Sequence, residues 1–93
     1  MQEMNSPKVL NKNHLNKIPE NSIFVGRPSK WGNPFVIGKD GCREEVIMKY
    51  RVYLRQHEEL TKEAKTELAG KNLICFCAPK PCHADVLLEI SNS

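Results

Sequence analysis

A short apolar run over residues 73–76 (LICF) constrains the fold of this chain more than any other segment. Successive side chains of a strand point to opposite faces, and both faces of this run are apolar. A strand of that kind is typical of the buried centre of a sheet whose faces are covered by other elements. A proline-containing loop follows, and Val86, Leu87 and Ile90 then give a helix its apolar side. The sequence therefore predicts a Rossmann-like strand, loop and helix at its carboxyl-terminal end.

The remaining patterns fit one small α/β domain. The chain has 93 residues, which is enough for a single hydrophobic core. We expect this core to lie between a small sheet and the helices packed on it. The domain should span residues 1–93, with the polar residues 1–6 frayed at the terminus.

Local patterns place the other elements along the chain. Short runs of β-prone residues predict strands at residues 9–10, 23–25 and 35–37. Apolar residues at helical spacing predict helices over residues 42–57 and 60–69. Asp40 is the expected N-cap of the first helix, Gly70 the C-cap of the second, and Pro81 a first-turn residue of the last helix.

Composition and charge narrow the classes of partner. Hydrophobic residues make up 40% of the chain and charged residues 27%, as in an ordinary globular protein. Apolar runs are too short to span a membrane, and the first residues lack the pattern of a signal peptide. We therefore expect a cytoplasmic protein without a membrane partner, whose four cysteines are reduced. The net charge of +3 permits an anionic partner but is lower than is usual for a dedicated nucleic-acid module.

Three of the four cysteines and one of the three histidines fall within one segment of nine residues. If a strand continued through it, Cys75 and Cys77 would lie about 6.6 Å apart on one face, too far apart for thiolates on one tetrahedral zinc. Zinc sites more often use two cysteines separated by two residues in a turn. We therefore favour no metal or other cofactor. The alternative is a zinc site of Cys75, Cys77, Cys82 and His83, which requires the strand to end or bend at Phe76.

The same segment offers candidates for catalysis, although no reaction follows from them. A thiol at a helix N-terminus has a lowered pKa, so Cys82 is a candidate reactive cysteine. His83 and Asp85 are the other candidates, each acting on the sugar or base of a ligand. Adjacent helix positions do not face each other, so Cys82 and His83 are not expected to form a nucleophile–base pair. Structural roles are the alternatives: Cys75 as a small buried hydrophobe, and His83 bonded to a backbone carbonyl.

A second chemical segment is the loop expected over residues 26–34 (GRPSKWGNP). Arg27 and Lys30 supply cations that can hold phosphate, in a stretch with few acidic residues, and Trp31 supplies a plane on which a base or ribose can stack. Asn33 can read the edge of a base. These four residues are the predicted ligand-binding set. The alternative for Trp31 is a place in the core, the usual position of a single Trp in a small domain.

Three stretches of the chain carry a resemblance to a known family. They are residues 26–35 (GRPSKWGNPF) with residues 37–41 after them, residues 75–79 (CFCAP) and residues 81–87 (PCHADVL). Over about residues 7–91 the chain resembles a family of small prokaryotic and bacteriophage domains of unknown function, domain of unknown function 4326. The resemblance implies a phage or bacterial source and brings no reaction with it. The cysteine–histidine turn is also similar to that of a second uncharacterised α/β family, which supports the Rossmann-like interpretation alone.

The two chemical segments are expected to form one site. Both should be loops at strand ends in a domain too small for two sites, so we expect them to meet at the carboxyl edge of the sheet. We expect the site to bind an anionic small molecule, a nucleotide or nucleotide derivative, in a small phage or bacterial enzyme or sensor. The alternative is a zinc-stabilised module that binds nucleic acid or a host protein.

Overall fold

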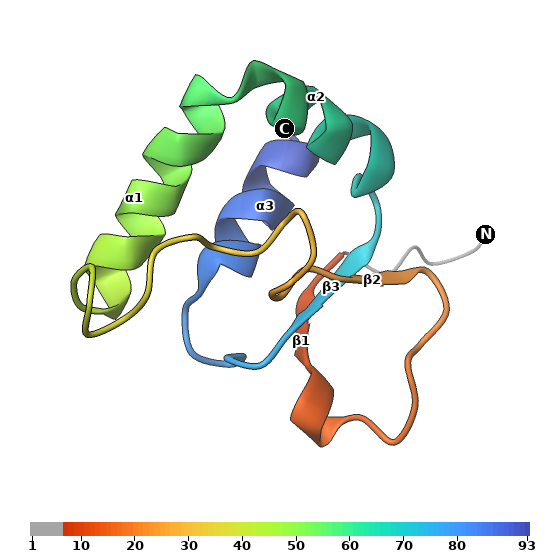
Figure 1. Ribbon diagram of the computed structural model, residues 1–93. Helices are drawn as coiled ribbons and strands as arrows, with labels where there is room; N and C mark the ends of the chain where they lie inside the picture. Colours follow the sequence, from red (N-terminus) through yellow and green to blue (C-terminus); the bar gives the residue numbers. More distant parts are fainter. Residues whose placement is uncertain (1–6) are drawn as a thin grey trace.

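The computed structural model describes residues 7–93 as a parallel sheet with helices packed on it (Figure 1). The strands are β1 (Val9–Asn11), β2 (Ser22–Phe24) and β3 (Asn72–Cys75). Their order in the sheet is β1-β3-β2, so β3 is the central strand, as its apolar sequence predicted. Both neighbours run parallel to β3, which places the carboxyl ends of all three strands at one edge. The predicted fraying of residues 1–6 lies outside the described residues.

Helices make up the rest of the regular structure. A short 3-10 helix, η1 (Lys12–His14), follows β1, and α1 (Arg43–Gln56), α2 (Glu58–Glu67) and α3 (His83–Ser91) come later. α3 packs against β1, β3 and both other α-helices, so it lies in the middle of the molecule (Figure 1). The prediction of a small α/β domain that ends in a Rossmann-like strand, loop and helix is confirmed. Within residues 7–93, every helix is too short or too polar to cross a membrane.

The predicted strand at residues 35–37 is wrong, because this segment belongs to the loop between β2 and α1. The carboxylate of Asp40 accepts a 2.8 Å hydrogen bond from the backbone N–H of Val36, and the Val36 carbonyl oxygen accepts one from the Asp40 N–H, also at 2.8 Å. These local bonds satisfy backbone groups that a strand would use. Gly38 and Gly41 have positive φ angles of 93° and 134°, which turn the chain away from an extended path.

The helices α1 and α3 do not begin where the sequence predicted. Cys42, not Asp40, is the N-cap of α1, because Asp40 is bonded to the preceding loop. Cys82 caps α3, so Pro81 precedes the helix instead of lying in its first turn. In each helix, the carboxylate three residues after the capping cysteine accepts a hydrogen bond from that cysteine's backbone N–H, at 2.8 Å in α1 and 2.9 Å in α3. This reciprocal cap fixes where both helices start.

The helix α2 also differs from its prediction at both ends. It begins at Glu58, two residues earlier than expected, and Leu68 is its C-cap in place of Gly70. Gly70 lies in the turn that follows, with a positive φ of 75°. The glycine therefore reverses the chain toward β3 after the helix has already ended.

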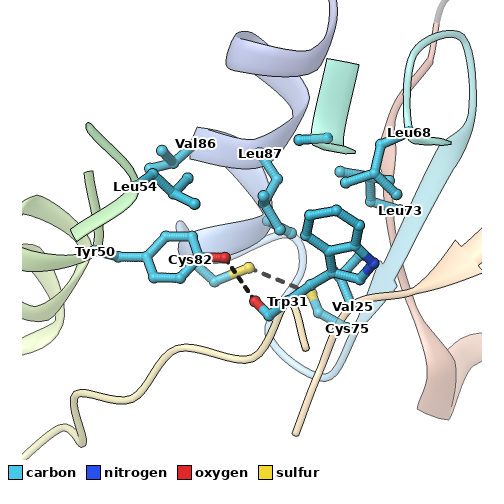
Figure 2. Packing of buried hydrophobic residues seen from close by; sticks show 12 residues of the cluster. Val25, Trp31, Tyr50, Leu54, Leu68, Leu73, Cys75, Cys82, Val86 and Leu87 are labelled. Atoms are coloured by element: carbon cyan, nitrogen blue, oxygen red, sulfur yellow. Dashed lines mark hydrogen bonds between the residues drawn. The ribbon is translucent and has the colours of Figure 1, made fainter. Parts of the chain in front are cut away.

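The hydrophobic core lies between the sheet and the helices (Figure 2). Trp31 belongs to this core, with only 4% of its surface exposed, in agreement with the core alternative for this residue. Its carbonyl oxygen accepts a 2.6 Å hydrogen bond from the hydroxyl of Tyr50, which ties the loop after β2 to α1. Figure 2 shows the indole beside Leu87 of α3. The loop that carries Trp31 is thus anchored to the core by its own side chain.

Candidate functional site

A cavity of about 430 Å³ lies where β2 and β3 end and where α1 and α3 begin. Its walls come from the loop after β2, the start of α1, and the loop between β3 and α3. The two chemical segments of the sequence therefore meet in space, as predicted. Residues of the predicted sets that line this cavity are Arg27, Asn33, Cys75, Cys77, Cys82 and His83.

Arg27 is placed by a tight turn that follows β2. Ser29 bonds the carbonyl oxygen of Gly26 twice, through its backbone N–H (2.9 Å) and its hydroxyl (2.6 Å), and so closes the turn around Arg27. Gly32 packs so closely against Arg27 that a Cβ atom there would lie 2.6 Å from the arginine Cγ. A side chain at residue 32 would displace Arg27, so the glycine helps to keep the arginine in the cavity wall.

Arg43 is a second cation of the cavity, and it was not among the residues predicted to bind a ligand. It is the first residue of α1, and its Nη1 donates a 3.0 Å hydrogen bond to the carbonyl oxygen of Pro81. That bond joins the start of α1 to the loop before α3. A cation in the first turn opposes the helix dipole, which favours negative charge at this end. This local conflict, beside Glu44 and Glu45, is a pattern from which Arg43 could have been identified.

His83 stands in the cavity wall as a neutral ring. Its Nε2 lies 2.7 Å from the carbonyl oxygen of Val25, so this nitrogen carries the proton and donates it. Burial lowers the pKa of His83 below its ordinary value; the bond to Val25 partly opposes this, and the charge of Arg27 adds to it. Because Nε2 is used in this way, Nδ1 is left as a hydrogen-bond acceptor. The structural alternative for His83, a bond to a backbone carbonyl, is confirmed.

Cys75 and Cys82 form a buried pair in the same wall. Their Sγ atoms lie 3.3 Å apart, and the backbone N–H of Cys77 donates to the Cys75 sulfur at 3.4 Å. Donation from Cys82 is the main cause that lowers the pKa of Cys75 to about 6. The pKa of Cys82 is raised, chiefly by its hydrogen bond to Cys75 and then by burial. Its position at a helix N-terminus made Cys82 the expected reactive thiol, whereas these contacts favour the thiolate at Cys75.

The chain bends directly after Cys75, where β3 ends, so Cys75 and Cys77 do not lie on one continuous strand. The side chain of Asn11 at the end of β1 holds this bend: its Nδ2 donates to the carbonyl oxygens of Phe76 (3.2 Å) and Ala78 (2.8 Å). The zinc alternative required such a bend. Even so, within residues 7–93 no group of three or more His, Cys, Asp or Glu side chains is arranged to hold a metal ion.

Lys30 lies outside the cavity, on the side of the loop that faces α2. Its Nζ forms ion pairs with Glu63 (2.8 Å) and Glu67 (3.1 Å) and lies 4.9 Å from the centre of the Trp31 ring. The hydrogen bonds to Glu63 and then Glu67 raise the pKa of Lys30. The expectation that this segment has few acidic neighbours is therefore wrong for Lys30, because its partners come from a distant part of the sequence.

Asn33 and Asp85 are mainly engaged in holding the backbone. Asn33 is buried in the cavity wall, where its Nδ2 donates to the carbonyl oxygen of Val46 (3.2 Å) and its Oδ1 accepts from the N–H of Phe35 (2.9 Å). Asp85 does not line the cavity, and its carboxylate accepts the N–H of Cys82 at the start of α3. Both side chains thus position other groups of the site, Asn33 the loop after β2 and Asp85 the helix that carries His83.

The composition of the cavity suits an anion with a flat apolar part. Arg27 and Arg43 line it, whereas no Asp or Glu of the described residues does. Guanidinium groups bind phosphate or carboxylate through two parallel hydrogen bonds. Phe35 and Phe76 add aromatic surface, and the Phe76 side chain is half exposed. The stacking plane that the sequence placed at Trp31 is therefore offered by two phenylalanines instead.

Comparison with known proteins identifies the family. A family model described as Domain of unknown function (DUF4326) matches residues 9–93. The chain is also 39% identical over 74 residues to the "Uncharacterized 12.4 kDa protein in nrdA-td intergenic region" of Enterobacteria phage T4, across 75% of this chain and 67% of the phage protein. No solved structure matches the chain. The resemblance carried by the three sequence stretches is confirmed, and the chain belongs to the family Domain of unknown function (DUF4326).

Proposed function

We propose that this protein binds a nucleotide or nucleotide derivative in the cavity at the carboxyl edge of its sheet. The observation that carries the proposal is that two arginines and aromatic surface share a cavity that no described carboxylate lines. A mononucleotide presents the matching groups, an anionic phosphate and a flat base. A volume of about 430 Å³ is also in the range of small-molecule sites in proteins.

Each group of the nucleotide has a partner in this arrangement. Arg27 and Arg43 come from different elements and hold the phosphate, which neither could enclose alone. Phe35 or Phe76 stacks against the base. Such stacking accepts any base, because every base has an aromatic face. His83 accepts a hydrogen bond at Nδ1 from a ribose hydroxyl or an amino group of the base.

The position of the cavity in the fold supports the same proposal. Ligands of open α/β sheets bind outside the carboxyl ends of the strands, and this cavity lies at that edge between the ends of β2 and β3. The support from position is independent of the support from composition, because it depends only on the strand order. We also propose that the protein binds this ligand in the cytoplasm.

A calorimetric titration with a panel of mononucleotides tests the proposal. Arg27→Ala should weaken binding by about 1–3 kcal/mol, or about 5- to 150-fold, the range for a lost charge-assisted hydrogen bond. Lys30→Ala is the matched control, because it removes the same charge from the same loop on the side that faces Glu63 and Glu67. The affinity of this variant should stay within about twofold of wild type, because Lys30 lies outside the cavity and the long-range effect of one exposed charge is largely screened by salt.

The salt dependence of binding separates a mononucleotide from a polynucleotide. One phosphate group held by two arginines gives a shallow decrease in affinity with salt, whereas a nucleic acid that spans many phosphates gives a steep one. A steep slope with short DNA or RNA and no mononucleotide binding would favour the nucleic-acid module. Equal losses in Arg27→Ala and Lys30→Ala would show a diffuse charge effect and contradict a site at the cavity.

A further inference from the structure

Two sulfur atoms of the cavity wall are close enough to become bonded (Figure 2). The Sγ atoms of Cys75 and Cys82 lie 3.3 Å apart and belong to free thiols. A disulfide bond is about 2.05 Å long, so an approach of about 1.3 Å would close it. The two cysteines end β3 and cap α3, respectively, and a turn of six residues joins them. That turn is not part of a helix or strand.

The two sulfurs have different chemical environments. Cys75 accepts a 3.4 Å hydrogen bond from the backbone N–H of Cys77, and the thiol of Cys82, 3.3 Å away, can donate to it. The backbone N–H of Ala78 also lowers the pKa of Cys75. Several donors directed at one sulfur stabilise a thiolate, which is the nucleophilic form of cysteine. When Cys75 is the thiolate, the thiol of Cys82 is the donor between the two sulfur atoms. The geometry therefore gives the two cysteines distinct roles, with Cys75 as the attacking sulfur.

Both sulfurs can be reached by a small molecule, although neither is a surface residue. Cys75 and Cys82 are buried by 96% or more, but both line the cavity at the edge of the sheet. A small molecule that enters this cavity can therefore reach both sulfur atoms. Cys42 offers the contrast within the same chain, because it is exposed and does not line the cavity.

We propose that Cys75 and Cys82 form a peroxide-reactive dithiol, which reduces a small hydroperoxide that enters the cavity. The Cys75 thiolate attacks the terminal oxygen of the hydroperoxide, so that an S–O bond forms, the O–O bond breaks, and the alcohol (or water) leaves with a proton. The sulfur of Cys82 then attacks the resulting sulfenic acid. An S–S bond forms, the S–O bond breaks, and the hydroxide leaves as water with the proton of Cys82. In total, two thiols and one hydroperoxide give one disulfide, one alcohol and one water.

This reaction goes beyond nucleotide binding and does not require it. The full chain is purified reduced, treated with hydrogen peroxide in the absence of nucleotide, quenched, denatured and alkylated. Mass spectrometry should then show the loss of two hydrogen atoms and two fewer alkylated cysteines. Trypsin does not cut between Lys80 and Pro81, so Cys75 and Cys82 stay on one peptide while Cys42 lies on another. Fragmentation of the first peptide assigns the disulfide, and a small dithiol added afterwards should restore both thiols.

Single variants separate the two roles. Cys82→Ala removes the resolving thiol, so a sulfenic acid should accumulate at Cys75 and be trapped by dimedone, a 1,3-diketone reagent. Cys75→Ala should abolish both the disulfide and the trapped product. Cys42→Ser is the matched control and should leave the rate of disulfide formation within about twofold of wild type, because Cys42 lies outside the cavity. Circular dichroism confirms that each variant is folded before it is oxidised.

Four results would overturn the proposal: no disulfide in wild type, a disulfide that pairs Cys77 or Cys42, dimedone labelling at Cys82 instead of Cys75, or labelling at Cys75 that is no faster than at Cys42. Elemental analysis of protein purified without chelator is a further arm. About one zinc per chain that is lost in Cys77→Ser would mean that the sulfurs are metal ligands and not a peroxide-reactive pair. Because no step uses nucleotide, failure here leaves the proposed nucleotide site untouched.

Discussion

His83 and Lys30 show what the sequence can predict for single residues. The bond from His83 to a backbone carbonyl was among the alternatives expected for this residue, and its partner is the carbonyl oxygen of Val25. The pairing of Lys30 could not be predicted, because Glu63 and Glu67 are more than thirty residues away in the sequence. Local sequence shows which groups are present in a segment, but it does not show which distant charges neutralise them.

The lowered pKa of His83 predicts that the free energy of unfolding falls as the pH is lowered. The unfolded chain lets this histidine titrate near pH 6.5, whereas the folded protein keeps it neutral to lower pH. Below about pH 6.5 the unfolded state therefore binds the extra proton, so the stability that is present at higher pH is lost. One such group gives a slope of at most about 1.4 kcal/mol per pH unit.

Urea denaturation followed through the fluorescence of Trp31 measures this effect at about pH 7.5, 6.5 and 5.5. His83→Gln should show a weaker dependence on pH than wild type across this range, whatever its stability at pH 7.5. His14→Gln is the control, because His14 is exposed in η1. Identical pH dependence in wild type and His83→Gln would contradict a buried, neutral ring. The pKa of Cys75 is also lowered, so Cys75 adds a pH dependence of the same sign to the free energy of unfolding. This contribution is present in both wild type and His83→Gln, so it cancels when the two are compared.

Periodicity predicted most of the elements, and local side-chain bonds explain the failures. The central strand and the helices were visible from apolar spacing, because burial against the core leaves that pattern in the sequence. The segment at residues 35–37 has the same β-prone composition as a strand but is a loop, because Asp40 bonds its backbone. Composition does not distinguish a strand from this loop, because both need apolar side chains. The strand packs them in the sheet, whereas residues 35–37 use them to line the cavity.

The helix α1 should depend strongly on Leu54, whose side chain is fully buried against the core. Leu54→Ala should lower the free energy of unfolding by about 2–5 kcal/mol through lost burial and the cavity left behind. Val52→Ala on the same helix is the matched control, because Val52 is 45% exposed, and its cost should be about half a kcal/mol or less. Equal effects of the two substitutions in urea denaturation would show that α1 does not dock through Leu54.

At the scale of the whole molecule, the cavity is built from segments that are distant in sequence. The sequence predicted that the two chemical segments would meet, because parallel strands bring their carboxyl ends to one edge. It did not predict Arg43, which reaches the cavity from the start of α1 and depends on how that helix docks. The family assignment could not supply these contacts either, since it brings no reaction or ligand with it.

The central claim is that a nucleotide occupies this cavity, and chemical-shift mapping tests it most directly. The chain of 10.6 kDa is small enough for backbone amide spectra to be recorded during a titration with the tightest-binding mononucleotide. The account predicts that the largest shifts fall on amides around Arg27, Phe35, Arg43, Phe76 and His83. They should decrease strongly in Arg27→Ala and persist in Lys30→Ala. Shifts confined to the exposed face of α2, or no shift with any nucleotide at millimolar concentration, would contradict it.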